Sequence, residues 1–524
     1  MSPSRASWVL PTAIVAAVTA IGAAVRLVLL HDSVFADELS TYWILSGRSL
    51  SGVVSTVHTD AEITPPLYFV LAWLTTKVAS SVEMLRLPSF IAGVAVIPLV
   101  YLLGVRTVGR WAGAIAAALT ALSPFMIFYS TEARGYELMI ALVLCSTLAL
   151  LGGVDSGRAR WWVLYALSSC AAAYTHYTAV FALGAQFLWV FWAHPEARRA
   201  ALLANVAAVA GFLPWLSGLI ADLQSPTTKI LAALEPFTFH TAATSLARWA
   251  FGFPFEIVRL SSLPGIPALA LMAAGLATAI LAMGVAIWGR AASWVRPNSR
   301  LALILALALA APVSAALISA VGSDVLGTRN LAVSWPGLAL VVATLLVSVP
   351  QPFRFLSVAL VLAGFTIAAV KMTEARYQRP QVRNATNFID REASPGDVVV
   401  DATRVTPGPL TAVDFSLDRP LQVVRVGIPQ ERDHPFGVGD PVLPPSDVAR
   451  RAAAIANGRR IFLVTATDKG PNEPNPLGAA AVGGLPATYR LVQAQSYPGL
   501  LPMATLVYAK RHGSAKASED GGPS

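Results

Sequence analysis

Runs of apolar residues long enough to cross a lipid bilayer recur along roughly the first 370 residues and then stop. A spanning helix needs roughly 20 predominantly apolar residues. Clear candidates lie at residues 8–30, 87–105, 111–129, 137–154, 200–219, 265–288, 301–321, 331–349 and 353–370. The stretch 161–192 would measure roughly 48 Å as one helix, so it is expected to turn back near residues 174–177. The pattern predicts a polytopic α-helical membrane protein with about eleven spans.

One further apolar segment, residues 65–79, is not expected to cross the membrane. It reads PPLYFVLAWLTTKVA, which is short and begins with two prolines. We expect a helix at the membrane surface, inside a long outer loop at residues 31–86.

Arginines in short loops indicate which way these spans cross the membrane, because short loops rich in arginine tend to stay in the cytoplasm. The loops with arginines fall on alternate turns, and these arginines are Arg106, Arg110, Arg158, Arg160, Arg198, Arg199, Arg290, Arg296, Arg300 and Arg354. With these loops inside, the loop 31–86 and the polar residues after 371 lie on the extracytoplasmic face of the cell membrane.

The polar residues that follow predict an extracytoplasmic α/β domain at 372–512, after a membrane domain at 1–371. Short apolar runs indicate strands, and amphipathic stretches between Pro/Gly clusters indicate helices. The expected strands are 398–400 and 461–464, and the expected helices are 384–391 and 446–457. Residues 513–524 have the composition of a disordered tail.

The composition of the chain excludes several classes of protein. With 55% hydrophobic and 13% charged residues, the chain is not a soluble domain. Its net charge of +9 comes with no basic patch interleaved with aromatic residues, so no nucleic acid partner is expected. Both cysteines lie in apolar runs, which argues against a disulfide framework. The outer loops have no tight Asp-x-Asp motif, so we predict no cofactor and no required metal, although a divalent cation is compatible with the acids present.

Acidic residues gather in the predicted outer loops. They are Asp37, Glu38, Asp60, Glu62, Glu132 and Glu137. Carriers tend to place ionisable groups near the bilayer midplane, whereas an enzyme acting on a lipid headgroup needs them at the interface. Asp37 and Glu38 could also simply favour a helix N-terminus through the helix dipole.

The loop YSTEARGYE carries an arginine, Arg134, on the outside, against the general charge bias. This placement indicates that a carboxylate or an anionic ligand such as a phosphate holds it. The alternative is an ion pair from Glu132 or Asp37 that only ties loops together.

Two more groups are predicted on the same face. His176 lies in the expected hairpin YTHYT, and Arg329 lies in the loop GSDVLGTRNL. A lone interfacial histidine beside tyrosines is more typically a hydrogen-bonded residue than a catalyst. Arg329 is a stronger candidate, because an arginine at a helix N-terminus adds to the positive potential offered to a phosphate.

Several motifs, in order, carry a family resemblance. FADELSTYWI, HTDAEITPPLYFVLAWL, MLRLPSFIAGVAVIPLVYLLGVRTVGRWAG and SPFMIFYSTEARGYEL resemble GT-C membrane glycosyltransferases of the dolichyl-phosphate-mannose-protein mannosyltransferase type, which include bacterial aminoarabinose transferases. The resemblance covers residues 20–200, and YTHYTA and GTRNL are similar more loosely. This sequence has Arg329-Asn330 where the family usually has Arg-Tyr.

The resemblance implies roles for the matching residues. Asp37 and its neighbour Glu38 match the essential acidic pair, with Asp37 the expected catalytic base. Arg134 and Arg329 are the expected ligands of the donor phosphate. The expected substrate-binding residues are Glu132, His176, Tyr136 and His58.

The implied activity is inverting transfer of mannose, arabinose or a similar sugar from a polyprenyl-phosphate donor to an envelope glycan, lipid or protein. Two alternatives from other classes are a transporter or flippase of lipid-linked sugars, and a non-catalytic membrane scaffold. A transporter predicts charges at mid-depth, and apart from Arg26 the spans are nearly free of charge.

Overall fold

A computed structural model describes residues 6–35, 37–59, 62–225, 237–255, 257–288, 298–322, 325–403, 411–426, 443–467 and 473–510. The chain divides into two compact units. The first comprises residues 1–31 and 40–377, and the second comprises 32–39 and 378–524. The boundary expected at 371 is therefore drawn at 377, and a short segment of the first outer loop belongs with the C-terminal residues. The expected disordered tail, 513–524, lies outside the described residues.

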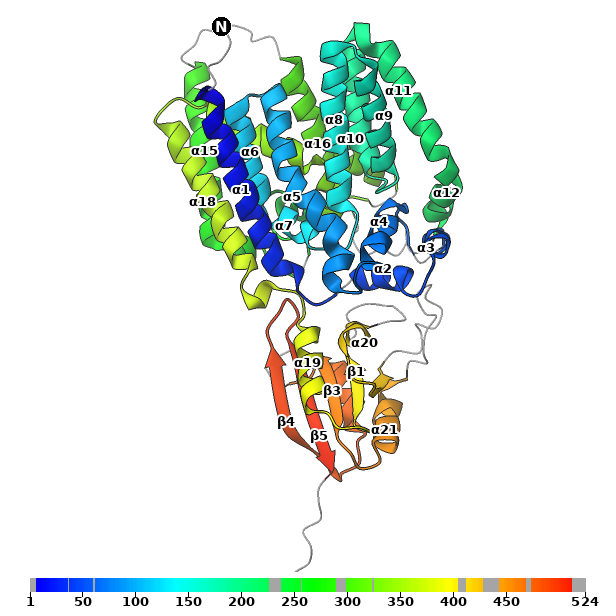
Figure 1. The fold of residues 1–524 in the computed structure, drawn as a ribbon. Helices are drawn as coiled ribbons and strands as arrows, with labels where there is room; N and C mark the ends of the chain where they lie inside the picture. The colour runs from blue at the N-terminus through cyan, green and yellow to red at the C-terminus, as the bar shows by residue number, and fades with distance from the viewer. Residues whose placement is uncertain are drawn as a thin grey trace, which may run out of the picture. The chain divides into compact units, whose positions relative to one another are not determined.

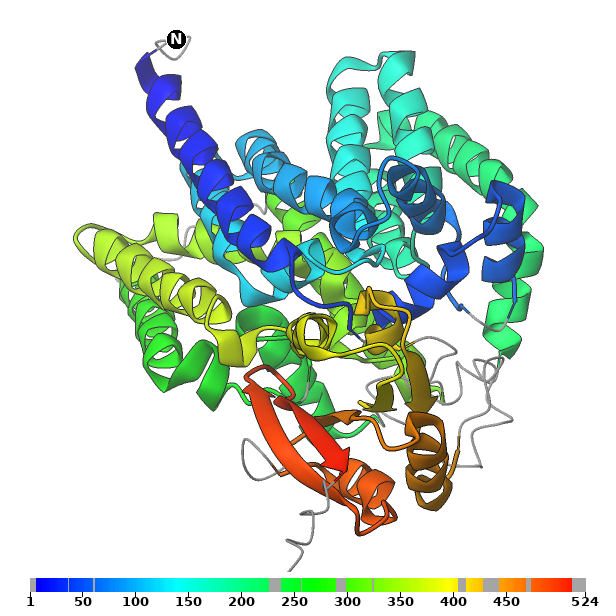
Figure 2. The same ribbon diagram turned by 60° about the horizontal axis from the view of Figure 1, so that its bottom comes forward.

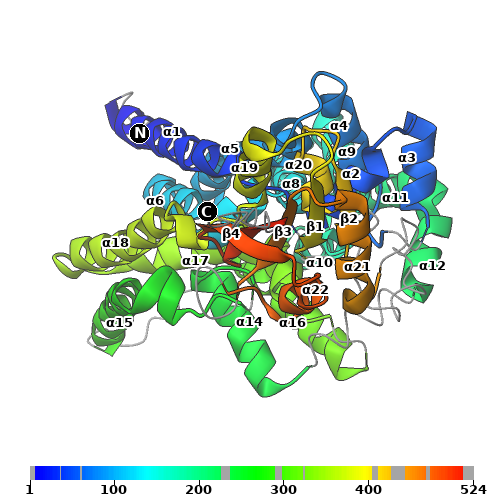
Figure 3. The same ribbon diagram turned by 90° about the horizontal axis from the view of Figure 1, so that it is seen from below.

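Long apolar helices build the first unit and stand side by side (Figure 1). They are α1 (Ala6–Leu30), α5 (Val82–Thr107), α8 (Tyr136–Ser156), α15 (Ile266–Trp288), α16 (Ser299–Ala320), α17 (Trp335–Ser348) and α18 (Phe353–Met372). Figure 3 shows the molecule from below, with α15 beside α18. In the described part of the chain, 8 helices are long and apolar enough to cross a membrane, or up to 9 if one bent pair counts as a span. The chain is a membrane protein, and this count is lower than the eleven expected.

Two of the expected spans are interrupted. The span 111–129 is split into α6 (Arg110–Leu122) and α7 (Pro124–Ser130), which are bent by 63°. Proline has no N–H to continue the helix, and Ser123 caps the new one by accepting a hydrogen bond from the Met126 backbone N–H at 3.4 Å. The span 200–219 runs through α11 (Arg198–Phe212), a 3₁₀ turn η2 (Leu213–Trp215) and α12 (Leu216–Gln224), after a first turn η1 (Pro195–Ala197).

The expected hairpin is present. Helices α9 (Ala159–Ala173) and α10 (Ala179–Ala193) are separated by a turn at residues 174–178. Each helix has 15 residues, which is short for a bilayer crossing. This shortness, with the bend at Ser123, accounts for the lower span count.

The first outer loop contains three short helices, α2 (Asp37–Leu45), α3 (Leu50–Val57) and α4 (Leu67–Thr76). Helix α4 has 10 residues, too few to cross a bilayer, as its prolines predicted. Its buried residues Tyr68, Phe69 and Ala72 pack in a cluster with Leu85 and Ala133. Among the described residues, the unit also contains the helical elements α14 (Phe239–Phe251), η3 (Ser261–Gly265), η4 (Thr328–Ser334) and η5 (Ala375–Tyr377).

An ion cluster marks one end of the helices. Asp155, near the end of α8, accepts hydrogen bonds from Arg106 of α5 at 2.8 Å and from Arg300 of α16 at 2.6 Å. Three loops predicted to share one side of the membrane therefore meet at one end of the unit. Tyr136 begins α8 at the opposite end, roughly 30 Å away at 1.5 Å per residue.

The second unit is an α/β domain. Its strands are β1 (Val398–Ala402), β2 (Gln422–Arg425), β3 (Ile461–Ala466), β4 (Tyr489–Tyr497) and β5 (Met503–Lys510), in the order β2-β1-β3-β5-β4. Strand β1 is parallel to β2 and β3, and β5 is antiparallel to β3 and β4. The long β4–β5 pair is prominent in Figure 2.

Helices cover both faces of this sheet (Figure 3). They are α19 (Val382–Glu392), α20 (Ala412–Ser416), α21 (Pro445–Ala456) and α22 (Pro476–Gly483). Val398 and Val400 pack in a buried cluster with Ala452 of α21, while Phe462 on β3 contacts Phe388 of α19. The two expected strands and two expected helices are present, and β2, β4, β5, α20 and α22 were not anticipated.

Candidate active site

Asp37 and Glu38 form the first turn of α2, but their environments differ. The Glu38 side chain is fully buried, and its carboxylate accepts a hydrogen bond from the Phe35 backbone N–H at 3.1 Å. The Glu38 N–H in turn donates to the Phe35 carbonyl at 3.2 Å. This reciprocal pattern fixes the chain turn that enters the helix. Asp37 is half-buried, which makes it the more accessible carboxylate of the pair.

The candidate site residues are divided between the two compact units. Asp37 and Glu38 belong to the second unit, and the other candidate residues belong to the first. The first-unit candidates are therefore described on their own.

Arg134 is held by a carboxylate that the sequence analysis did not assign to it. Its guanidinium donates two hydrogen bonds to Glu62, at 2.5 and 2.9 Å, and both side chains are almost completely buried. The guanidinium also lies 5.7 Å from the centre of the Phe69 ring. Glu62 is fixed further by the Thr64 hydroxyl, which donates to it at 2.9 Å. The planar fork expected to face a phosphate is thus directed at the Glu62 carboxylate.

His176 lies in the turn between α9 and α10 and is buried. Its Nδ1 accepts a hydrogen bond from the Thr178 backbone N–H at 3.3 Å and lies 2.9 Å from the Thr178 hydroxyl. Burial, with the charges of Arg134 and Arg329, lowers the pKa of His176 to about 3. The imidazole is therefore neutral near pH 7. With Nδ1 accepting, its proton sits on Nε2, so His176 can donate a hydrogen bond but is a poor base.

Arg329 and Tyr136 complete the group around His176. Arg329 is half-buried at the start of η4, and its charge acts on His176. The Tyr136 ring lies 5.0 Å from the His176 ring and 4.5 Å from the Tyr129 ring. Glu132 is buried two residues before Arg134, whose backbone N–H donates to the Glu132 carbonyl at 2.8 Å. We call Arg134, Tyr136, His176 and Arg329 the His176 group.

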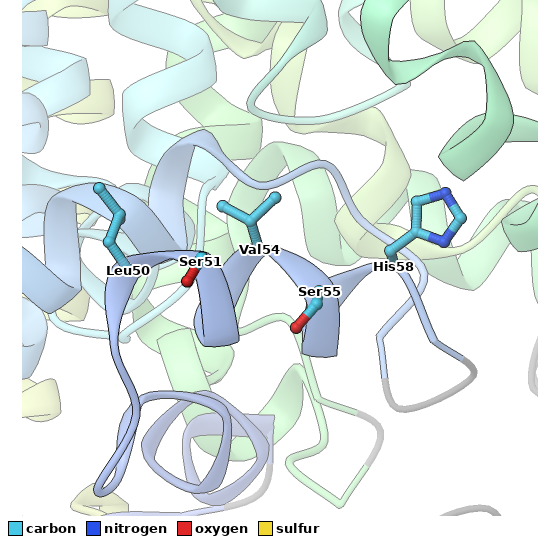
Figure 4. A pocket seen from close by; sticks show the side chains of 5 residues that line it. All are labelled: Leu50, Ser51, Val54, Ser55 and His58. Atoms are coloured by element: carbon cyan, nitrogen blue, oxygen red, sulfur yellow. The ribbon is translucent and has the colours of Figure 1, made fainter.

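His58 lies elsewhere on the first unit. It follows the last turn of α3, where its Nε2 is 3.1 Å from the Ser217 hydroxyl and its ring meets Trp215 edge-on at 5.5 Å. One face of α3 lines an open hollow of about 610 Å³ (Figure 4). The side chains in that hollow are Leu50, Ser51, Val54, Ser55 and His58. The contacts of His58 within the described residues do not join it to the His176 group.

Arg26 and Glu137, for which the sequence analysis gave no partner, belong to a second buried network of charged groups. Arg26 Nε donates to the Ser130 hydroxyl at 2.8 Å, and that hydroxyl donates to Glu137 at 3.1 Å. Arg26 and Glu137 are fully buried, so Glu137 lies inside the packed unit rather than in an exposed loop. A paired charge at this position is a structural tie between α1, α7 and α8.

Among the described residues, no group of three or more His, Cys, Asp or Glu side chains is placed to hold a metal ion. That no metal is required remains a prediction.

Comparison with known proteins bears on the class of the fold. Residues 64–217 match the sequence model of the family described as dolichyl-phosphate-mannose-protein mannosyltransferase. That segment contains Arg134, Tyr136 and His176. None of the curated proteins compared matches the chain.

Solved structures match over most of the chain. The crystal structure of ArnT from Cupriavidus metallidurans bound to undecaprenyl phosphate is 13% identical, with a TM-score of 0.56, and the match covers 96% of this chain and 98% of that one. The archaeal oligosaccharyltransferase AglB from Archaeoglobus fulgidus, in complex with an inhibitory peptide and a dolichol-phosphate, is 13% identical, with a TM-score of 0.46 over 88% and 70% of the two chains. Arabinofuranosyltransferase AftD from Mycobacteria is 16% identical, with a TM-score of 0.40 over 95% and 40%.

The likeness to ArnT shows that this chain has its fold. The family match over residues 64–217 and this shared fold agree with the resemblance to GT-C membrane glycosyltransferases that the sequence motifs predicted.

Proposed function

We propose that the chain transfers a sugar, with inversion, from a polyprenyl-phosphate donor to a hydroxyl of a glycan, lipid or protein. The observation that carries this proposal is the His176 group, which combines two guanidinium groups and a neutral hydrogen-bond donor near one end of apolar helices. A lipid phosphate is an anion anchored at the membrane surface, and this group has the chemistry to bind one.

On the donor side, the bond between the anomeric carbon and the phosphate oxygen breaks, and its electrons go to the phosphate. We assign the half-buried Arg329 to this negative charge, and the Nε2–H of His176 donates to the same anion or to a sugar hydroxyl. Arg134 contributes its positive charge from within its pair with Glu62. The phosphate is a good leaving group and needs no general acid.

On the acceptor side, the hydroxyl oxygen forms the new bond to the anomeric carbon and loses its proton. We assign Asp37 as the base, because it is the more accessible member of the acidic pair and begins a helix. Glu132, Tyr136 and His58 are proposed to contact sugar or acceptor groups.

The reaction is proposed to occur at the extracytoplasmic face of the cell membrane. The ion cluster of Arg106, Asp155 and Arg300 lies at the other end of α8 from Tyr136. If that arginine-rich end is cytoplasmic, the His176 group faces outside.

A transfer assay with purified protein tests the proposal. The full chain in lipid nanodiscs is given polyprenyl-phosphate mannose or polyprenyl-phosphate arabinose, each with a labelled sugar, and a panel of hydroxyl acceptors. The expected result is acceptor-dependent release of polyprenyl phosphate and a product with inverted anomeric configuration. Movement of intact donor between leaflets without cleavage would instead support a flippase.

A further inference from the structure

The short segment at residues 32–39, which includes the start of α2, contacts residues that come after the membrane domain in the sequence. Residues 32–39 form one compact unit with residues 378–524. Within this unit, the Asp32 carboxylate accepts a hydrogen bond from the Arg379 backbone N–H at 3.3 Å. The Ser33 hydroxyl accepts one from the Arg383 backbone N–H at 3.0 Å.

The Ser33 contact satisfies a donor in the first turn of α19. The first N–H groups of a helix have no partner inside it, and a side-chain oxygen normally supplies one. Gln381, the residue before α19, makes no such cap with its side chain. Ser33, 350 residues away in sequence, accepts instead from Arg383, so the early segment acts as part of the domain's own structure.

A buried ion pair completes the docking. Arg379 Nε lies 3.5 Å from the Glu38 carboxylate, and their side chains are 3% and 0% exposed. The same Glu38 oxygen accepts the hydrogen bond from the Phe35 N–H that fixes the entry into α2. Arg379 therefore acts on the group that sets the turn directly before Asp37.

We propose that Arg379 is a positioning residue for sugar transfer: by holding the Glu38 carboxylate it fixes the turn that presents Asp37. This inference rests on the proposed function, in which Asp37 is the base. It gives the C-terminal domain a place in the catalytic machinery, beyond that of an appended module. Breaking a buried ion pair from one side is destabilising, so loss of the Arg379 charge should loosen the turn while the rest of the domain stays folded.

The experiment compares three variants of the full chain in nanodiscs with wild type. Arg379→Gln removes the charge, Arg379→Lys keeps it, and Arg450→Gln removes an exposed arginine of the same domain as the control. Each variant is measured for kcat and donor KM. Amide hydrogen exchange of a peptide covering residues 33–45 gives a readout that does not need activity.

We expect Arg379→Gln to lower kcat by about 10- to 100-fold with little change in donor KM, since misplacing a reacting group by about 1 Å can cost 10²-fold. Exchange at residues 33–39 should rise in the same variant. Arg379→Lys should recover part of both effects, and Arg450→Gln should show neither.

Two results would overturn the inference. Unchanged exchange at residues 33–39 in Arg379→Gln would show that the arginine does not hold the segment. Faster exchange with an unchanged kcat would show that the turn does not position the base. If Asp37→Asn is fully active, the proposed function fails in this form, and the positioning role falls with it, while the exchange measurement separately decides whether Arg379 holds the segment.

Discussion

The guanidinium of Arg134 and the carboxylate of Glu62 form a two-bonded pair across 72 residues of sequence. The pair joins the loop before α8 to the first outer loop and is almost fully buried. It lies beside His176, whose pKa the Arg134 charge helps to lower. A structural tie and a contribution to the site potential are thus combined in one residue.

Arg134→Gln is expected to lower the free energy of unfolding, because it leaves the Glu62 charge buried. Breaking a buried pair from one side costs about 3–5 kcal/mol. Thermal unfolding in detergent measures the change, and the double variant Arg134→Gln/Glu62→Gln should recover part of it. An Arg134→Lys protein with normal stability and a strongly raised donor KM would instead assign Arg134 directly to the phosphate.

Asp37→Asn should reduce transfer by roughly 10² to 10⁴-fold, because it removes the proposed base and keeps its shape. Donor binding and expression should stay close to wild type. Asp447→Asn, an exposed carboxylate of α21, is the matched control and should keep full activity. Near-normal turnover in Asp37→Asn would reject this base.

Arg329→Gln should raise donor KM more than acceptor KM, since a charge-assisted hydrogen bond to the phosphate contributes about 1.5–3 kcal/mol. Arg329→Lys should be intermediate because it keeps the charge but not the fork. Arg199→Gln, which changes an exposed arginine, serves as the control. Equal effects on donor and acceptor would contradict a phosphate role.

Acid stability depends on His176. Its pKa is lowered from 6.5 to about 3 by burial and by two arginines. Between these two pH values, His176 binds a proton in the unfolded chain but not in the folded chain. The stability contribution is complete above pH 6.5 and is lost as the pH falls toward 3. In His176→Asn the amide oxygen can still accept from Thr178, and the loss of melting temperature between pH 6.5 and 4.5 should become smaller. An identical pH profile would show that the ring is not kept neutral.

Topology is testable with introduced cysteines, after Cys145 and Cys170 are replaced by alanine. Glu196→Cys and Ser394→Cys change exposed positions. An impermeant thiol reagent should label the Ser394→Cys protein in intact cells, and the Glu196→Cys protein after permeabilisation alone. The opposite pattern would place the arginine-rich end and the C-terminal domain on the reverse sides.

Local sequence signals predicted the local structure well. The length of the apolar run 161–192 required a turn, and the turn at 174–178 is present. The two prolines before α4 correctly marked a short helix. The bend at Ser123 also had a visible signal, the Ser-Pro step, but the apolar run through it favoured one span. Strand β4 was missed because its residues are mostly exposed and polar, with no buried alternation to detect.

Partners distant in sequence could not be predicted in this way. Glu62 was visible as an acid of the outer loop, but any of several carboxylates could have met Arg134. Asp37 was predicted as the base from the family resemblance, but nothing in the sequence showed that Glu38 is fully buried and Asp37 only half-buried. The docking of residues 32–39 with the C-terminal domain depends on helix caps and an ion pair, and neither leaves a periodic pattern in the sequence.

The capping of α19 by Ser33 also sets an order of events during synthesis. Roughly 340 residues lie between Leu39 and Gln378, and ribosomes need about 20–70 s to add them at about 5–20 residues per second. Throughout that time Ser33 and Glu38 have been made but Arg379 and Arg383 have not. The turn before Asp37 is therefore completed after the last membrane helix has been synthesised. A ribosome that stalls between residues 373 and 379 leaves a chain with its membrane helices made and its acidic turn unfinished.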